Sequence, residues 1–262
     1  MLLGELTWPE AQEHARRGSV VILPTGSTEQ HGPHLPLHTD ISCAFEIAKR
    51  VADRAGCLVA PPLPFGYSEL WHRYPGTISF TPPTFRAAVL DICQSLIRTG
   101  FKRLFILNGH NPNLAPLQAI AEEVVDRYED RSISIAVASY FFMGKEACDR
   151  IGDNFRDGTH ANEFETSLQL ALCPTLVKFD LVKDRPYVYD RVICFAEGAM
   201  VVNAWPDPAS HNGIYGNPAA ASAEKGRAYL DALIQAIVDF VGRFREGKHD
   251  PIPLPPDAHA RC

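Results

Sequence analysis

The sequence has 262 residues, of which 46% are hydrophobic and 21% charged, and this composition excludes disordered, collagen-like and coiled-coil chains. The formal net charge of -6, without any basic block, argues against a nucleic-acid partner. No apolar run approaches the roughly 20 residues that span a bilayer, the start lacks a secretory pattern, and the cysteines are scattered without a C-x-x-C pair. We therefore expect a cytoplasmic protein with no membrane partner.

The first part of the chain predicts two strands and one helix before a long loop. The β-branched run at 19–23 is typical of a buried strand, and a second, short strand is predicted at 57–60. Between them, apolar residues recur with a period near 3.6 over 41–54, which predicts a helix. The Pro-, Gly- and aromatic-rich stretch 61–83 is too long for a simple connection, and such loops usually carry function.

Helices and strands continue to alternate in the rest of the chain. The predicted elements are helix 84–99, strand 103–107, helix 114–128, strand 133–139, helix 162–172 and helix 219–244. Within 175–218, strands at 188–195 and 199–204 or irregular structure are equally plausible. The alternation favours an α/β fold with a mostly parallel sheet covered by helices on both faces. We predict one domain over 1–262, with a core at about 5–240 and a loose tail at 250–262.

Polar residues follow two of the predicted strands. Glu29 and His31 come after the first strand, His110 comes after the strand at 103–107, and Asp40 precedes the helix at 41–54. The carboxyl ends of parallel strands meet at one edge of a sheet, so these side chains are expected to converge. Carboxylate and imidazole without thiolate suit Zn²⁺, Mn²⁺ or Fe²⁺. The pattern predicts a metal site.

Other interpretations exist for these residues taken one at a time. A lone Glu or His in a loop is usually a solvated surface residue. Asp40 has a rival role as the N-cap of the next helix, although Thr39 is able to cap instead. His34 and His38 share an eight-residue window with His31. Either of them could orient a carboxylate, cap a helix or be merely exposed.

A third cluster lies at the start of the predicted helix 162–172. His160 precedes the helix, and Glu163 and Glu165 fall in its first turn. Their side chains can face a site at the helix N-terminus and act there as acid/base groups. The two glutamates could also simply complement the helix dipole. The stretch 65–77 offers aromatic walls and hydroxyls for a small polar ligand, or hydrophobic plugs.

Three motifs resemble the creatininase family of metal-dependent amidohydrolases, over about residues 5–240. They are Gly26-Ser27-Thr28-Glu29-Gln30-His31-Gly32-Pro33-His34-Leu35-Pro36 with Asp40, Asn108-Gly109-His110-Asn111, and His160-Ala161-Asn162-Glu163-Phe164-Glu165-Thr166-Ser167. The resemblance implies a three-layer α/β/α fold, a homohexamer, a small-molecule substrate and two divalent metal ions, Zn²⁺ or Mn²⁺ above all, with Fe²⁺ as a further option.

The resemblance also implies roles for single residues. Glu29 and His31 would each hold one metal, Asp40 would bridge the pair, and His110 would complete the first ion. His160 and Glu165 would form the acid/base pair, and Glu165 is also a candidate metal ligand. The implied substrate contacts are Ser68, Asn111 and Asp157.

Two departures from the family bear on the substrate. Creatinine-hydrolysing members carry a Glu where this chain has Pro112, and a Trp shortly before the third-motif His, where this chain has Asn154 to Thr159. They argue against creatinine itself, and Arg156 could meet an anionic group instead. We expect hydrolysis of a C–N bond in a small amide, formamide or cyclic amide by a metal-bound hydroxide. The alternatives are hydrolytic opening of an oxidised inositol-type ring ketone and a non-catalytic, metal-stabilised assembly protein.

Overall fold

The fold is built on a four-stranded parallel sheet. The computed structural model describes residues 1–128, 130, 132–152, 160–183, 193–196, 199–202 and 206–248, with 193–196 and 199–202 described by their backbone. The sheet has the order β2-β1-β3-β4. Its strands are β1 Val20–Thr25, β2 Leu58–Val59, β3 Arg103–Asn108 and β4 Ser134–Ser139. β1 and β3 pair from Val20 opposite Arg103 to Thr25 opposite Asn108, so their carboxyl ends finish side by side.

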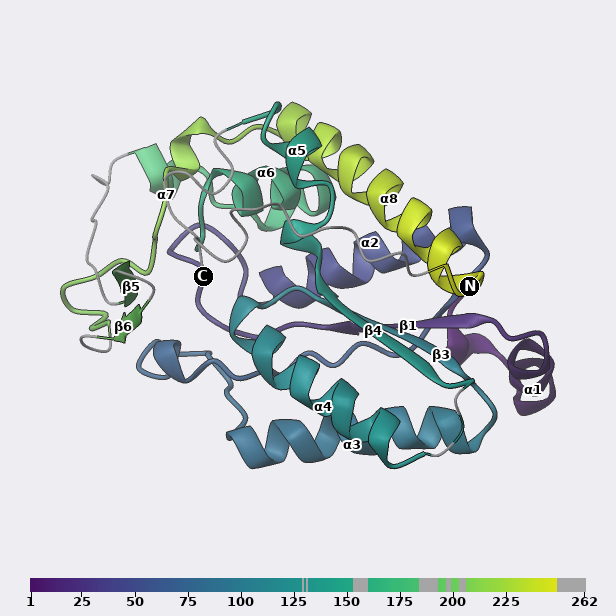
Figure 1. Ribbon diagram of the computed structural model, residues 1–262. Helices are drawn as coiled ribbons and strands as arrows, with labels where there is room; N and C mark the ends of the chain where they lie inside the picture. Colours follow the sequence, from purple (N-terminus) through teal and green to yellow (C-terminus); the bar gives the residue numbers. More distant parts are fainter. Residues whose placement is uncertain are drawn as a thin grey trace.

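Helices cover both faces of this sheet and produce three layers (Figure 1). One face carries α3 (Pro82–Arg98) and α4 (Leu114–Asp126), and the other carries α2 (Thr39–Ala55), α6 (Glu163–Leu172) and α8 (Ala223–Arg245). Val20 and Ile22 of β1 pack into the core beneath α2 and α8, whereas Val21 and Leu23 pack into the core beneath α3. Because both faces are covered, the strand is apolar at nearly every position. The predicted three-layer fold is confirmed.

The structure adds one helix that the sequence pattern does not predict and decides between the two alternatives for 175–218. α1 (Trp8–Arg16) begins at a capping box formed by Thr7 and Glu10 and buries no residue. β5 (Ile193–Ala196) and β6 (Ala199–Val202) form a separate antiparallel pair, so strands are present in the segment 175–218 that the sequence left open. The short helices are η1 Leu3–Glu5, η2 Glu69–Trp71, η3 Asn111–Asn113, η4 Tyr140–Phe142, α5 Lys145–Cys148, η5 Pro174–Leu176, α7 Asp180–Lys183 and η6 Pro218–Ala220.

The start of α2 differs from the predicted cap. His38 is the N-cap, the helix begins at Thr39, and Asp40 lies in the first turn. The Thr39 hydroxyl donates a hydrogen bond to the carbonyl oxygen of Pro36 at 2.7 Å, so it caps no helical N–H. The Asp40 carboxylate is turned toward His31 and His110 instead. The rival capping role of Asp40 is therefore wrong.

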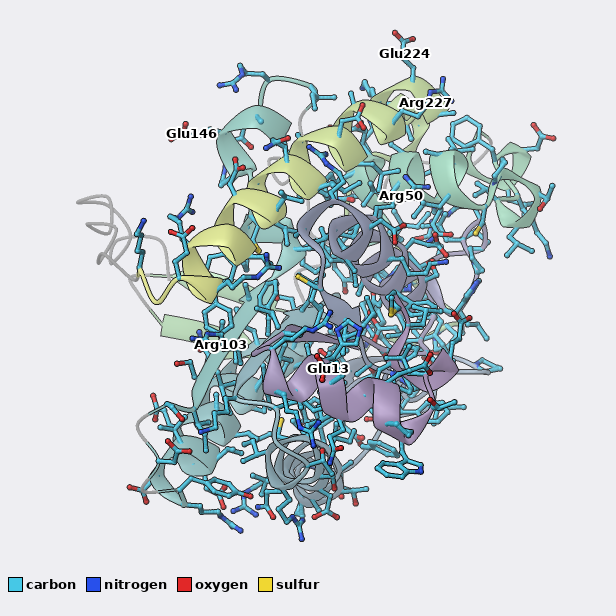
Figure 2. The ribbon with its side chains drawn as sticks, turned by 90° about the vertical axis from the view of Figure 1, so that its right-hand side faces the viewer. Glu13, Arg50, Arg103, Glu146, Glu224 and Arg227 are labelled. Carbon is cyan, nitrogen blue, oxygen red and sulfur yellow. The ribbon has the colours of Figure 1, made fainter. Side chains whose placement is uncertain are left out.

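Charged side chains lie on the outside of the three layers. Figure 2 shows Glu146 on α5 and Glu224 at the start of α8 standing clear of the ribbon, and both are exposed. Among the helices that the structure describes, none combines the length and the apolar character needed to cross a bilayer.

Candidate metal centre

Two glycines at the strand ends let α2 approach the sheet closely. Gly26 follows β1, and a Cβ at this position would lie 2.7 Å from the backbone of Ile41. Gly109 follows β3, and a Cβ there would lie 2.4 Å from the carbonyl oxygen of Asp40. Both distances are shorter than a van der Waals contact, so a side chain would push the helix away. The glycines thus place the Asp40 carboxylate between the loops that follow β1 and β3.

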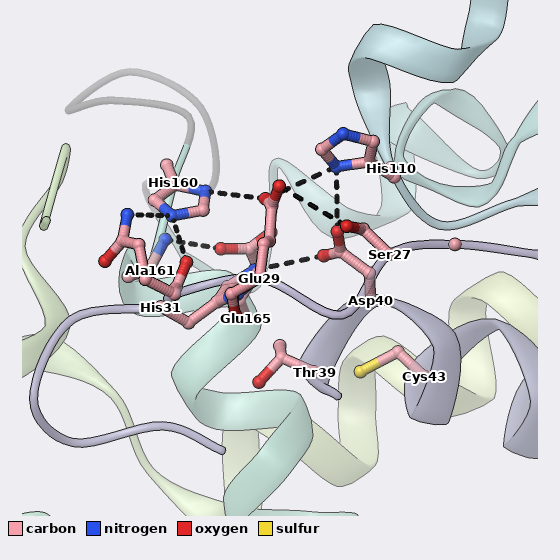
Figure 3. Close-up of polar contacts among 12 residues, drawn as sticks. Ser27, Glu29, His31, Thr39, Asp40, Cys43, His110, His160, Ala161 and Glu165 are labelled. Atoms are coloured by element: carbon pink, nitrogen blue, oxygen red, sulfur yellow. Dashed lines mark hydrogen bonds and ion pairs between the residues drawn. The ribbon is translucent and has the colours of Figure 1, made fainter. Parts of the chain in front are cut away.

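The Asp40 carboxylate lies at the middle of a buried cluster (Figure 3). Its Oδ2 is 2.8 Å from Nδ1 of His110, and its Oδ1 is 3.0 Å from Nε2 of His31. Oε1 of Glu29 lies 3.3 Å from the same nitrogen of His110. The two oxygens of one carboxylate therefore face two different imidazoles, which come from the loops after β1 and β3.

The start of α6 completes the cluster. Oε1 of Glu165 lies 3.9 Å from Nε2 of His31, and Nδ1 of His160 lies 3.7 Å from Oε1 of Glu29. The side chain of Asn162 caps α6 by accepting a hydrogen bond from the Glu165 backbone N–H, at 3.1 Å. All three segments named from the sequence motifs thus meet in one place.

Ala161 adopts a backbone conformation that is rare for a residue with a Cβ. Its φ is +51°, in the left-handed region, which costs on the order of 1 kcal/mol. In this conformation its N–H donates to Oε2 of Glu165 at 2.5 Å. The preceding residue, His160, pairs on both sides of its backbone with Tyr215, at 3.1 and 2.8 Å. The Ala161 conformation and these hydrogen bonds together fix the position of the His160 imidazole relative to the Glu165 carboxylate.

Each of the three imidazoles has one ring nitrogen held by a backbone carbonyl oxygen. The pairs are His31 Nδ1 with Glu29 O at 3.2 Å, His110 Nε2 with Tyr67 O at 2.9 Å, and His160 Nε2 with Gln30 O at 2.8 Å. A carbonyl oxygen only accepts, so the ring nitrogens of His31 and His110 that face it carry the hydrogen. Nε2 of His160 lies 2.8 Å from the side-chain Nε2 of Gln30 as well as from the carbonyl oxygen. In the neutral ring the other nitrogen then has its lone pair on the side of the carboxylates, where a metal ion would bind it. Metal-binding histidines have this arrangement.

Only imidazoles lie beside the three buried carboxylates of the cluster to balance their charge, among the residues that the structure describes. Glu29, Asp40 and Glu165 are each at most 3% exposed, and within the described part of the chain none of them pairs with Lys or Arg. Burial would lower the pKa of His31, but Asp40 and the other carboxylates outweigh it and raise this pKa to about 10. Burial also raises the pKa of Glu165 to about 7. The His31 shift indicates that the buried carboxylates attract a cation.

The residues fit divalent metal ions. Nε2 of His31 and Oδ2 of Asp40 are buried, and neither has a partner with hydrogen-bond geometry among the described residues. Three groups place their ligand atoms within 4.8 Å of one another: Glu29, Asp40 and His110; His31, Asp40 and Glu165; and Glu29, His31 and His160. Nitrogen and oxygen donors without sulfur suit Zn²⁺ and Mn²⁺. A metal ion would satisfy the orphaned atoms and neutralise the carboxylates together.

The residues expected to contact substrate lie in different environments. Ser68 is buried behind His110: its hydroxyl is 3.3 Å from Nε2 of that ring and hydrogen bonds to the Ser27 hydroxyl. Asn111 is exposed at the start of η3. Asp157 lies outside the described residues, as do Arg156 and the other residues of 153–159.

The structure separates the two glutamates of the third motif. Glu163 accepts a hydrogen bond from the Tyr229 hydroxyl at 2.9 Å and lies 3.4 Å from Nζ of Lys225, so it joins α6 to α8. Glu165 faces His31 and Asp40, and no group of potential ligands combines it with His110. Of the weaker histidine candidates, His34 bonds to the Thr166 hydroxyl at 2.9 Å, and His38 occupies the N-cap position of α2 without a side-chain capping hydrogen bond.

Sequence reasoning missed the residues that support His160. The side chain of Gln30 joins two segments by hydrogen bonds. Its Oε1 accepts from the Gly32 N–H at 2.9 Å, and its Nε2 donates to the Gly213 carbonyl at 3.1 Å. Trp71 stacks on His160 with ring centroids 4.4 Å apart. The aromatic stretch 65–77 was a signal for Trp71, whereas nothing local indicated that residues around Gly213 would reach the site.

Comparisons with known proteins agree with this geometry. Residues 4–241 match the family model Creatininase, described as creatinine amidohydrolase. A creatinine amidohydrolase of Pseudomonas putida is 33% identical, over 92% of this chain and 96% of the relative. A 3-dehydro-scyllo-inosose hydrolase of Thermotoga maritima is 28% identical, over 94% and 85%. A mycofactocin precursor peptide peptidase of Mycobacterium ulcerans is also 28% identical, over 94% of both chains.

Solved structures are similar over the same length. One described as "Creatininase Mn" superposes with a TM-score of 0.82 at 32% identity and covers 95% of this chain and 99% of its own. Another, described as "E122Q mutant creatininase, Zn-Zn type", has a TM-score of 0.77 at 32% identity, with coverage of 95% and 98%. The family match over nearly the whole chain shows that this protein belongs to the creatininase family.

Proposed function

We propose that this protein is a metal-dependent hydrolase that cleaves a C–N bond of a small amide, formamide or cyclic amide. The observation that carries the proposal is the buried convergence of three carboxylates and three imidazoles without a Lys or Arg partner in the described chain. Buried carboxylates destabilise the fold unless cations pair with them, so this cluster is suited to holding metal ions.

Two ions would share the site through Asp40. Glu29, Asp40 and His110 would hold one, and His31, Asp40 and Glu165 the other, because the two Asp40 oxygens already face the two sets. The place of Glu165 beside His31 supports a ligand role for it over that of proton carrier. When bound, such ions lower the pKa of coordinated water from 15.7 to about 7 and polarise a substrate carbonyl. The relatives described with Mn and Zn-Zn support these two metals.

His160 is the proposed proton carrier. Its Nε2 lies 2.8 Å from both the carbonyl oxygen and the side-chain Nε2 of Gln30, and we assign the ring hydrogen to Nε2, donating to the carbonyl, so that Nδ1 has a lone pair beside Glu29. As the oxygen of water bonds to the amide carbon, Nδ1 accepts the proton that this water loses. It then delivers the proton to the nitrogen as the C–N bond breaks. The products are a carboxylic acid and an amine, with no other reactant consumed.

Substrate contacts are proposed at the mouth of this site. Asn111 is exposed directly after His110 and is free to meet a substrate. Ser68 is bound to Ser27 and His110, which supports a role in holding His110. Asp157 stays a proposed contact on the family resemblance alone. Pro112 stands where creatinine-hydrolysing members have a Glu, so we favour a substrate other than creatinine.

Chelation and a substrate panel test the proposal. The protein would be stripped with EDTA, reloaded with Zn²⁺ or Mn²⁺, and assayed on creatinine, lactams, N-formyl amines and a short peptide. We expect activity that disappears with the metal and returns with it, while circular dichroism shows the fold retained. Unfolding on chelation together with no turnover of any compound would instead identify a structural site of an assembly protein.

A second candidate reaction is the opening of an oxidised inositol-type ring ketone. The observation that favours it is the similarity to the Thermotoga maritima 3-dehydro-scyllo-inosose hydrolase over 94% of this chain. The same water-activating site would attack a ketone, but a C–C bond would break. Product analysis with that inosose beside the amide panel separates the two reactions.

We also propose a homohexamer in the cytoplasm. Exposed apolar side chains such as Trp8, at 77%, and Phe142, at 53%, support burial against further copies of the chain. Five cysteines whose side chains the structure describes are free thiols, which supports a reducing compartment: Cys43, Cys57, Cys93, Cys148 and Cys173. Size-exclusion chromatography with light scattering should give six chains per particle, and a monomer would contradict the assembly.

A further inference from the structure

The imidazole of His160 is packed between two other rings. Trp71 stacks on it with a centroid distance of 4.4 Å and an interplanar angle of 20°. His31 lies 4.3 Å away at 38°. Trp71 and His31 have no ring contact with each other, so they lie on different sides of the imidazole. Rotation of the ring out of its plane is therefore blocked on both sides.

Trp71 is itself held rigidly. It is 3% exposed, and its backbone N–H donates to the Ser68 carbonyl at 2.9 Å. Tyr74 packs edge-on against it at 5.7 Å, and Tyr215 lies at 5.6 Å. Tyr215 also pairs with the backbone of His160, so backbone pairing and ring packing come from connected residues. The indole ring of Trp71 is thus held in place within the 61–83 loop, and its face in turn holds the imidazole of His160 in place.

The hydrogen bond from Nε2 of His160 to the Gln30 carbonyl does not by itself stop the imidazole ring from tilting. Both contacts of His160 with Gln30, to its carbonyl oxygen and to its side-chain Nε2, are made at the Nε2 atom at 2.8 Å, so the ring is still able to tilt about that atom and about the Cβ–Cγ bond. Only contact with a flat, immobile surface removes this tilt. For Nδ1 to stay directed at Glu29, 3.7 Å away, the plane of the imidazole has to be constant.

We propose that Trp71 is a positioning residue that fixes the plane of the His160 imidazole, so that Nδ1 stays directed toward the metal-binding carboxylates. The expected effect on kcat rests on the proposed function, whereas the expected effect on the orientation of His160 does not depend on any activity. Trp71 itself touches neither the reacting atoms nor the carboxylates among its described contacts.

Two substitutions of Trp71 and one matched control test it. Trp71→Phe keeps an aromatic face, whereas Trp71→Leu removes it. Phe85→Leu is the control, because Phe85 is 1% exposed in the core beneath α3, on the opposite face of the sheet. Crystals of all three variants would be soaked with Zn²⁺, bound zinc would be counted, and kcat and KM would be measured on the panel compound that the unmodified protein hydrolyses fastest.

In Trp71→Leu we expect His160 to be tilted or in more than one orientation, with the zinc content unchanged. The kcat should fall about 10- to 100-fold while KM changes little, which is the pattern of a misaligned proton carrier. Trp71→Phe should restore both the orientation and most of kcat. Phe85→Leu should lower thermal stability but leave kcat and His160 unchanged.

An unmoved His160 in Trp71→Leu would overturn the proposal, whatever the rate, and so would a tilted ring with normal kcat. If Trp71→Leu does not fold, Trp71→Met, which is similar in volume to Leu but unbranched and flexible, takes its place. If the unmodified protein hydrolyses no compound of the panel, the proposed function fails, and the crystallographic comparison still decides the positioning role.

Discussion

Gly109 is the position at which a single added methyl group should disrupt the metal centre. In Gly109→Ala the new Cβ would lie 2.4 Å from the Asp40 carbonyl oxygen and 3.1 Å from Cβ of Ala44. Ordinary C···O contacts begin near 3.3 Å, so the first turn of α2 has to retreat by about 1 Å. The Asp40 carboxylate would move with it, away from His110.

The size of the effect follows from this displacement. Overpacking of a rigid core costs about 1–3 kcal/mol of unfolding free energy. A ligand shifted by about 1 Å should weaken zinc binding by roughly 10- to 100-fold. The assays are urea unfolding in EDTA for the first quantity and Zn²⁺ titration against a competing chromophoric chelator for the second.

Gly242→Ala is the matched control. Gly242 lies in α8, and a Cβ there meets no atom within 4 Å. Alanine should stabilise this helix by about 0.5–1 kcal/mol and leave zinc binding unchanged. If Gly109→Ala bound zinc as tightly as the unmodified protein, at unchanged stability, the inference that the strand-end glycines set the position of Asp40 would be refuted.

Three further predictions concern the ligands and one buried histidine. Asp40→Ala should abolish binding of both ions, because each ion shares this carboxylate, and elemental analysis showing two zincs per chain would contradict the bridge. Glu165→Gln should leave one ion per chain, since Glu29, Asp40 and His110 stay intact. Loss of both ions, or retention of both, would contradict a ligand role of Glu165 at one ion only. Burial lowers the pKa of His34 to about 4, so between pH 6.5 and 4 the unfolded chain binds an extra proton. Stability should therefore fall by about 2–3 kcal/mol as the pH drops through this range, and His34→Asn should show a smaller fall in urea unfolding. Identical pH dependence in the two proteins would rule out this contribution.

The parts of the fold that were predictable are those determined by local patterns. The run at Val20–Thr25 is apolar because both faces of the sheet are covered, and this leaves a direct trace in the sequence. α2 shows the helical period and ends at Gly56, whose φ is +63°. α1 was not foreseen, because it is short and mostly polar and buries no residue.

The candidate site was predictable as a set of residues but not as a geometry. Glu29, Asp40 and His110 follow strands or start a helix, and the carboxyl edge of a parallel sheet brings such positions together. Glu163 and Glu165 looked alike in the sequence. Two residues along a helix are about 200° apart, so only one of them faces the cluster. The sequence motif alone does not say which one.

The support around His160 could not be predicted at all from local sequence. Gln30 acts through its backbone carbonyl, which every residue possesses, and Gly213 acts through its own carbonyl from far along the chain. The stacking of Trp71 depends on how the 61–83 loop folds over the sheet edge. These contacts arise from tertiary packing, and residue type carries little information about them.

The central claim is that the buried carboxylates and imidazoles hold two divalent ions. A crystal grown with Zn²⁺ and measured at the zinc absorption edge tests it most directly. The account predicts two anomalous peaks, one on each side of the Asp40 carboxylate, the first beside His110 and the second beside His31. Absence of anomalous signal within this cluster, in a crystal whose surface sites do bind zinc, would contradict it.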